Sequence, residues 1–92
     1  MKTLQELKRR QEFHIKSLLA SRTDSRGRRM NLTSLSLELG EAYGTVAGVV
    51  YGNRINPQIR AKIAAFLGQP VEELFLVEDL GTNGNGQAAQ AN

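Results

Sequence analysis

Residues 32–52, LTSLSLELGEAYGTVAGVVYG, decide the fold that we expect for this chain. Leu35 and Leu39 lie four residues apart before a glycine, and Val46 and Val49 lie three residues apart after it. Apolar residues at these intervals line one face of a helix. The stretch therefore predicts two short helices joined by a glycine turn, which is the pattern of a helix-turn-helix.

Particular residue types in this stretch suit a sharp turn between packed helices. Gly40 lets the chain turn, because glycine adopts left-handed backbone angles that a side chain would oppose. The small Ser36 lets the second helix cross close to the first. Glu41 stands where the motif usually has an aliphatic residue, and we expect Ala42 to supply that packing instead. The outer face of the second helix, expected over residues 43–51, is then free to enter a major groove.

The residues before this stretch predict a longer helix and a loop. Thr3 and Glu6 have the spacing of a capping box, which opens one helix, or two abutting ones, over about residues 3–21. The polar, arginine-rich segment 22–29 contains glycine and no apolar stripe, so we expect a flexible loop. Asn31 follows as the N-cap of the next helix.

Capping signals also divide the residues after the stretch. Asn56 followed by Pro57 starts a helix, since proline suits the first helical position, and Gly68 is expected to end it in a left-handed conformation. A last short helix is expected after Pro70. From residue 81 the chain reads GTNGNGQAAQAN, which has no apolar anchor and is expected to be disordered.

These elements predict an all-α fold, a small bundle of about five short helices that contains the helix-turn-helix. We expect a basic helical extension at 1–12, a helix-turn-helix DNA-binding domain at 13–80 and a disordered tail at 81–92. Three apolar residues near the end of that domain have no evident place in its core, namely Leu76, Val77 and Leu80. They predict a weak homodimer formed through residues 74–80.

Four short motifs give the chain a resemblance to a known family. They are Phe13-His14, MNLTSLS at 30–36, GEAYGTVA at 40–47 and KIAAFLG at 62–68. Through them the chain resembles the lambda-repressor-like family of five-helix DNA-binding domains, and most nearly its Ner-like regulators of phages and transposons. The resemblance implies a transcriptional regulator, often from a mobile element. The longer arginine-rich loop and the missing C-terminal tryptophan depart from the Ner-like pattern.

Charge is distributed unevenly along the chain, whose net charge is +3. Nine of the twelve lysines and arginines lie in residues 1–30, together with only three of the nine acids. Such a basic third predicts a surface that faces a polyanion. A solvated helix rich in lysine and arginine is an equal alternative.

The composition argues against an enzyme. There is no cysteine, which excludes disulfides, thiolate metal sites and cysteine nucleophiles, and His14 is the single histidine. The carboxylates do not cluster as metal ligands, and the glycines form no phosphate-cradling loop. We therefore expect no catalytic residue, metal site or cofactor. The apolar stretches are too short to span a bilayer, so we expect a cytoplasmic, nucleoid-associated protein without a membrane partner.

The expected reading face is the outer side of the second helix of the motif. Its exposed positions are expected to be Ala42, Tyr43, Gly44, Ala47, Gly48 and Tyr51. The two tyrosines could reach base edges or phosphates, and Ala47 could meet a thymine methyl. Gly44, Gly48 and Gly52 recur every fourth residue as a bare stripe. That stripe suits close approach to DNA or, alternatively, a tight contact with a partner protein.

Residues that flank the reading face are expected to contact the DNA backbone. Asn31, Thr33 and Thr45 could bind phosphates, although each could instead only cap its helix. Asn53 and Arg54 are expected to clamp the backbone, unless they are simple surface residues. The loop arginines could follow phosphates, enter a minor groove or remain solvated, and these are Arg26, Arg28 and Arg29.

Together these features predict a sequence-specific regulator that binds double-stranded DNA and acts as a repressor. Two alternatives remain open at this point. One is an antitoxin-type module that binds a partner protein as well as DNA. The other is an architectural protein that binds DNA without sequence preference.

Overall fold

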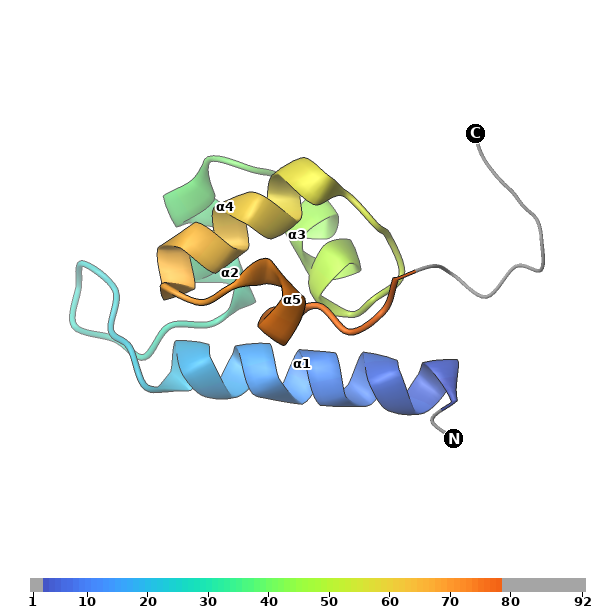
Figure 1. Cartoon of the computed structure of the whole chain (residues 1–92). Coiled ribbons are helices and arrows are strands. Elements are labelled where there is room, and N and C mark those ends of the chain that lie inside the picture. The colour runs from blue at the N-terminus through green and yellow to red at the C-terminus, as the bar shows by residue number, and fades with distance from the viewer. Residues whose placement is uncertain (1–2, 79–92) are drawn as a thin grey trace.

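The computed structural model describes residues 3–78, and this part of the chain contains five helices and no strand. The helices are α1 (Leu4–Ala20), α2 (Leu32–Leu39), α3 (Tyr43–Val50), α4 (Pro57–Leu67) and α5 (Val71–Leu74) (Figure 1). The expected all-α fold is confirmed, and each helix lies close to its predicted position. The expected disordered tail at 81–92, and Leu80 before it, lie outside the described residues.

Short polar side chains cap the starts of α1, α2 and α4, and glycine ends α2. Thr3 Oγ1 accepts a hydrogen bond from the Glu6 amide at 3.1 Å, and the Glu6 carboxylate accepts one from the Thr3 amide at 3.1 Å. Asn31 and Ser34 exchange the same pair of bonds at the start of α2. Gly40 ends α2 with a φ of 69°, a left-handed angle that suits glycine.

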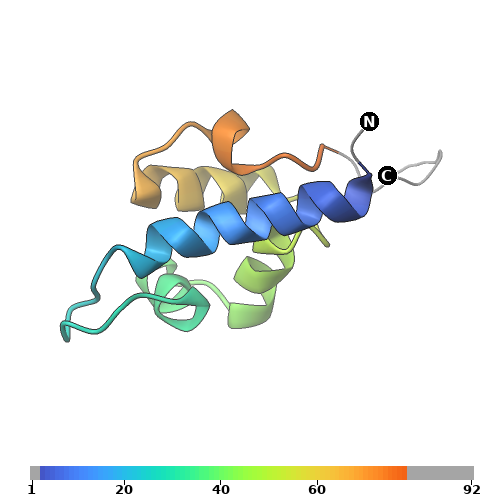
Figure 2. The same ribbon diagram turned by 90° about the horizontal axis from the view of Figure 1, so that it is seen from below.

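Helix α1 lies along one face of the bundle, with the other four helices packed above it (Figure 1), and in the view from below it crosses in front of them (Figure 2). It packs against α2, α3 and α5, while α3 also packs against α2 and α4. Helix α3 is therefore covered from three sides. None of the helices between residues 3 and 78 has the length and apolar character needed to cross a membrane.

The apolar core lies where the five helices meet. Every helix contributes a fully buried side chain, for example Ile15, Leu35, Val46, Ile63 and Leu74, each 0% exposed. Burial of these side chains supplies the main driving force for folding. Leu39, which the motif places at the joint between α2 and α3, is only partly buried against this core.

The turn between α2 and α3 differs from expectation. Ala42 is exposed, so the prediction that it packs in place of Glu41 is wrong. Glu41 is half-buried, and its carboxylate instead forms an ion pair with Lys62 of α4. The ion pair between Glu41 and Lys62 thus attaches the turn to α4.

Helix α1 is continuous, and its first half belongs to the bundle. Gln11 is fully buried, and its Nε2 donates to the carbonyls of Val49 and Val50 at the end of α3, both at 3.0 Å. Its Oε1 accepts from the amides of Leu76 and Val77, at 2.9 and 3.2 Å. The expected boundary between residues 12 and 13 therefore falls inside one helix.

The segment after α5 is buried, contrary to expectation. Phe75 is 4% exposed and Val77 0%, while Leu76 is half-buried. Arg60 of α4 donates to the Val77 carbonyl and lies over the Phe75 ring at 4.9 Å. The prediction that Val77 has no place in the core is wrong. Because Gln11 of α1 and Arg60 of α4 hold Val77, this residue is not available to a dimer through residues 74–80, and the dimer stays a prediction.

Candidate nucleic-acid interface

The exposed part of α3 is narrower than the sequence indicated. Tyr43 is 49% exposed, Ala42 and Gly44 are exposed, and Thr45 is half-buried. Ala47 is only 6% exposed and belongs to the core, so its prediction as a reading residue is wrong. The physical reason is that α1, α2 and α4 together cover more of the circumference of α3 than a two-helix contact would.

Tyr51 is also directed away from the expected reading face. It is partly buried against the core, and its hydroxyl accepts a hydrogen bond from Lys16 of α1 at 3.2 Å. The Lys16 ammonium lies 4.9 Å from the centre of the ring. Hydrogen bonds to Glu12 and then to Tyr51 raise the pKa of Lys16. Tyr51, which ends α3, therefore joins this helix to α1. It is a packing contact and not the exposed DNA contact that was expected.

The three glycines of the expected stripe have three different environments. No described atom lies within 4 Å of the position that a Cβ of Gly44 would take. A Cβ on Gly48 would stand 3.1 Å from Cδ of Arg54, whose side chain crosses it. Gly52 is buried at a φ of 80° beside Lys8 and Val77. A continuous bare stripe is therefore absent from the described surface.

The residues that follow α3 fold back onto it. The amides of Asn53 and Arg54 both donate to the Gly48 carbonyl, at 2.9 and 3.1 Å. The Asn53 side chain accepts a hydrogen bond from Lys8 Nζ at 3.1 Å. Asn53 therefore ties this turn to α1, and Lys8 is a neighbour that the sequence did not reveal. Arg54 is exposed beside Gly48.

The arginine-rich segment is a hydrogen-bonded hairpin, not the flexible loop that was expected. Oδ1 of Asp24 accepts from the amides of Arg26 and Arg28, at 2.8 and 2.9 Å. The Asp24 amide donates to the Arg28 carbonyl at 2.7 Å, and Thr23 pairs with Arg29 in an isolated antiparallel bridge. The backbone bonds from Arg28 and Arg26 lower the pKa of the Asp24 carboxyl. We call residues 22–30 the arginine hairpin.

The arginines of this hairpin divide into two groups. Arg22 donates to the Phe66 carbonyl at 3.1 Å and lies 5.2 Å from the centre of the Phe66 ring, so it fastens the hairpin to α4. Arg26, Arg28 and Arg29 are exposed. Their side chains form no hydrogen bond or ion pair within residues 3–78. Three guanidinium groups are thus held on an ordered loop and remain free for an anion.

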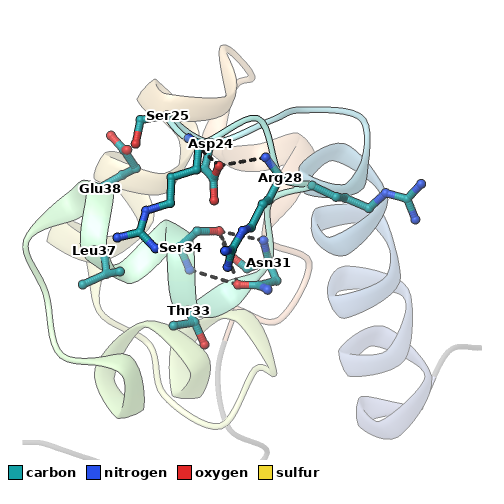
Figure 3. Close-up of a pocket in the computed structure, with 10 residues that line it drawn as sticks. Asp24, Ser25, Arg28, Asn31, Thr33, Ser34, Leu37 and Glu38 are labelled. Atoms are coloured by element: carbon teal, nitrogen blue, oxygen red, sulfur yellow. Dashed lines mark hydrogen bonds between the residues drawn. The ribbon is translucent and has the colours of Figure 1, made fainter.

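An open hollow of about 470 Å³ lies between the arginine hairpin and α2. Its lining combines the arginines with the first residues of α2, and comprises Asp24, Ser25, Arg26, Arg28, Arg29, Asn31, Thr33, Ser34, Leu37 and Glu38. Figure 3 shows the Arg28 side chain extending toward Asn31 and Ser34. We call this feature the hairpin hollow. Sequence reasoning found five of its polar residues, but not that they share one concave surface.

Two of the hollow's residues carried signals that sequence reasoning did not use. Asp24 stands two residues before an amide that it binds, which is the pattern of an Asx-turn. Leu37 falls outside the four-residue spacing of Leu35 and Leu39, which indicates an outward position, and it is 77% exposed on the wall of the hollow. The hydroxyl of Ser34 and the amide of Asn31 are engaged in the cap of α2, whereas Thr33 is exposed.

The structure therefore separates the expected contacts into two clusters and a remainder. The hairpin hollow gathers Arg26, Arg28, Arg29, Asn31 and Thr33. The start and middle of α3 present Ala42, Tyr43, Gly44, Thr45 and Gly48, with Arg54 crossing the last of these. Of the remainder, Ala47 is buried, while the partly buried Tyr51 and the exposed Asn53 accept hydrogen bonds from lysines of α1. Among the described residues, no group of three His, Cys, Asp or Glu could hold a metal ion.

Comparison with known proteins adds no family to these observations. No protein-family model matches the chain, no curated protein matches it, and no solved structure matches its fold. The resemblance to the lambda-repressor-like family therefore stays a prediction.

Proposed function

We propose that this protein binds double-stranded DNA through α3 and the hairpin hollow, and that it acts as a transcriptional repressor. The observation that carries the proposal is the arginine hairpin. Its three exposed arginines form no ion pair in the described chain, yet Asp24 orders the backbone that bears them. Ordered, unpaired guanidinium groups are suited to phosphate oxygens, which they bind through charge-assisted hydrogen bonds.

The composition of the exposed α3 surface supports a groove as the partner. A major groove is about 12 Å wide and admits one α-helix. The positions that α3 exposes carry small side chains, except for Tyr43. Small side chains allow the helix backbone to lie close to the base edges. The phosphates on the rim of the groove would then meet the arginine hairpin.

The regulatory role is supported by the sequence resemblance. The MNLTSLS and GEAYGTVA motifs occupy α2, the turn and most of α3, which are the elements that the proposal places on DNA. Origin from a phage or mobile element rests on the same motifs. A protein that covers a promoter by this surface would exclude the transcription machinery, which is the simplest form of repression.

The salt dependence of binding tests the proposal. Affinity for a duplex is measured by fluorescence anisotropy over a range of salt concentrations, for the wild type and two double variants of equal charge. The first is Arg28→Ala with Arg29→Ala in the hairpin hollow. The control is Arg9→Ala with Arg10→Ala on α1, where both arginines are exposed and outside that hollow.

The two double variants should behave differently if the hollow contacts DNA. The slope of log Kd against log salt should become shallower by about 0.9 for each hairpin arginine that meets a phosphate. The α1 control should keep the wild-type slope. Equal changes in both variants, or no binding of the wild type to duplex DNA, would contradict the proposal. Binding-site selection then separates a sequence-specific regulator from an architectural protein, which would yield no preferred sequence.

One observation favours a second function, that of a protein-interaction module. Phe13 is 75% exposed on the outer face of α1, between hollows of about 460 and 390 Å³. An exposed aromatic side chain is a frequent anchor of protein interfaces. If this face binds a partner, Phe13→Ser should abolish that interaction and leave the affinity for DNA unchanged.

A further inference from the structure

We infer that Arg54 is the base-reading side chain of this protein, held across Gly48 of α3 and directed at a guanine in the major groove. The inference rests on the proposed DNA binding. It assigns to Arg54 a role different from the phosphate clamp that its position after α3 suggested. It also assigns a role to Gly48, whose lack of a side chain leaves room for the arginine to lie against α3.

The geometry at Gly48 carries the first step. A Cβ at this position would lie 3.1 Å from Cδ, 3.3 Å from Cγ and 3.3 Å from Nε of Arg54. The aliphatic stem of the arginine therefore rests directly on the helix backbone. Gly48 lies within α3 and does not have a positive φ, so the backbone conformation does not require glycine here. The close contact at this position comes only from the Arg54 side chain that crosses it.

The chain after α3 explains how a residue beyond the helix reaches its middle. Gly52 takes a φ of 80° and reverses the chain direction. The amides of Asn53 and Arg54 then donate to the Gly48 carbonyl, at 2.9 and 3.1 Å. These bonds place the Arg54 backbone beside Gly48. The side chain consequently extends over the exposed side of α3 and not away from the end of the helix.

The chemistry of the remaining α3 surface shows why this arginine matters. The other exposed or half-exposed positions, Ala42, Tyr43, Gly44 and Thr45, offer two hydroxyl groups and no side chain with several donors. A guanidinium donates two parallel hydrogen bonds and matches O6 and N7 of guanine, the commonest specific contact in the major groove. Arg54 has no ion-pair partner among residues 3–78. Arg54 thus supplies the bidentate donor that α3 itself lacks.

The position of Arg54 over Gly48 also reduces the conformational entropy that the arginine side chain would lose on binding DNA. A long arginine side chain loses conformational freedom when a base immobilises it. Cγ, Cδ and Nε already lie over Gly48 before DNA is present, so less freedom would be lost on binding. Arg28 and Arg29 lie on the hairpin, away from this position, and are suited to phosphate contacts, because phosphate binding does not depend on a single orientation.

A double-mutant cycle on the full chain tests the inference. Wild-type protein first selects its preferred duplex from a random pool. Affinity for that duplex, for versions with each guanine replaced and for random DNA is then measured for Arg54→Ala, Gly48→Leu and the double variant. Gly48→Ala provides a milder displacement, and thermal melting establishes that every variant is folded. Arg54→Lys retains the charge but lacks the guanidinium fork.

The inference predicts a specific pattern. Arg54→Ala should lose about tenfold or more in affinity for the selected duplex, relax the preference at one guanine and change binding to random DNA little. Arg54→Lys should relax the same position. Gly48→Leu should reproduce this loss in the wild-type background. In the Arg54→Ala background it should cause almost no further loss, because the arginine that it displaces is already absent.

Three results would overturn the inference and can be told apart. If Gly48→Leu still weakens binding in the Arg54→Ala background, the glycine accommodates DNA directly. If Arg54→Ala weakens all sequences equally, Arg54 contacts phosphate and reads no base. Both results leave the proposed DNA binding intact, whereas failure of the wild type to bind any duplex removes the proposed function as well.

Discussion

Two polar regions, one in the middle of α1 and one just after its C-terminal end, use their polar groups in opposite ways. At Gln11, the side-chain amide is fully buried and makes four hydrogen bonds with the end of α3 and the segment after α5. We call this region the glutamine joint. In the arginine hairpin, Asp24 satisfies the backbone, while the side chains of Arg26, Arg28 and Arg29 are exposed.

The type of a polar residue therefore does not indicate whether its side chain is buried and hydrogen-bonded or exposed to solvent. Gln11 is uncharged and would pass as a surface residue, yet it connects three segments. Arginine behaves in both ways within this chain. Arg60 is buried under the C-terminal segment, and this burial lowers the pKa of its guanidinium, opposed by Glu78. Arg28 is exposed and lacks an acidic side-chain partner in the described region.

Removal of the glutamine joint should produce the largest effect. Gln11→Leu leaves the Val50 carbonyl and the amides of Leu76 and Val77 without this partner, whereas the Val49 carbonyl keeps the bond from the Gly52 amide. Each buried group that is left unpaired costs about 1–3 kcal/mol. We expect the free energy of unfolding to fall by about 3 kcal/mol or more, measured by urea denaturation. Gln5→Leu is the matched control, because Gln5 is exposed on the same helix and should change stability by less than about 0.5 kcal/mol. Similar losses for both variants would show that the joint is not structural.

A smaller effect is expected at Gly52, which adjoins the same joint. Gly52→Ala forces a side chain into a left-handed conformation, which costs about 1–2 kcal/mol. Its Cβ would also stand 2.9 Å from Cγ of Lys8 and 3.2 Å from a methyl of Val77. Gly40→Ala is the control, since Gly40 has a similar φ and no described atom within 4 Å of its Cβ position. Thermal melting should rank Gly52→Ala as more destabilising, and equal losses would mean that the contacts are relieved without cost.

The arginine hairpin should respond to acid locally. Its Asp24 carboxyl has a lowered pKa in the folded state, so its contribution is present above the ordinary carboxyl pKa. That contribution is lost as the pH falls through the lowered pKa. We expect the NMR signals of the Arg26 and Arg28 amides to move together, with a midpoint below that of an ordinary aspartate. A midpoint at the ordinary value would contradict this hydrogen-bonding scheme.

Substitutions at Asp24 separate the hydrogen bonds from the charge. Both amides donate to the same oxygen, Oδ1, so Asp24→Asn keeps the acceptor and removes the charge. Asp24→Ala removes both. We expect amide exchange at Arg26 and Arg28 to accelerate in the alanine variant and to change much less in the asparagine variant. Equal acceleration would assign the ordering of the hairpin to charge alone.

The smallest effect is expected one residue from Gln11. Glu12 pairs with Lys16 at 3.0 Å, and both side chains are partly exposed to solvent. Exposed pairs at this spacing contribute about 0.3–0.5 kcal/mol. Glu12→Gln should therefore change the urea midpoint scarcely at all, in contrast to Gln11→Leu. The adjacent positions thus show how far burial changes the energetic value of a polar side chain, and a large loss at Glu12 would break that contrast.

The sequence by itself determined the helices and their ends. Thr3, Asn31, Asn56 and Gly40 act through hydrogen bonds and backbone angles within a few residues, so their effects are readable locally. The stripe that includes Leu35 and Val46 likewise identified the core side of α2 and α3. The all-α fold followed from these local signals.

Only the tertiary structure decided which polar residues remain available. Ala47 and Tyr51 were misplaced because the sequence does not state how many helices surround α3. Gln11 reaches carbonyls 38 and 39 residues away, and Arg22 reaches one 44 residues away. No local spacing encodes such pairings, since they depend on how the helices cross. The seat of Arg54 on Gly48 depends in the same way on a chain reversal that becomes visible only when α3 and the turn after it are assembled.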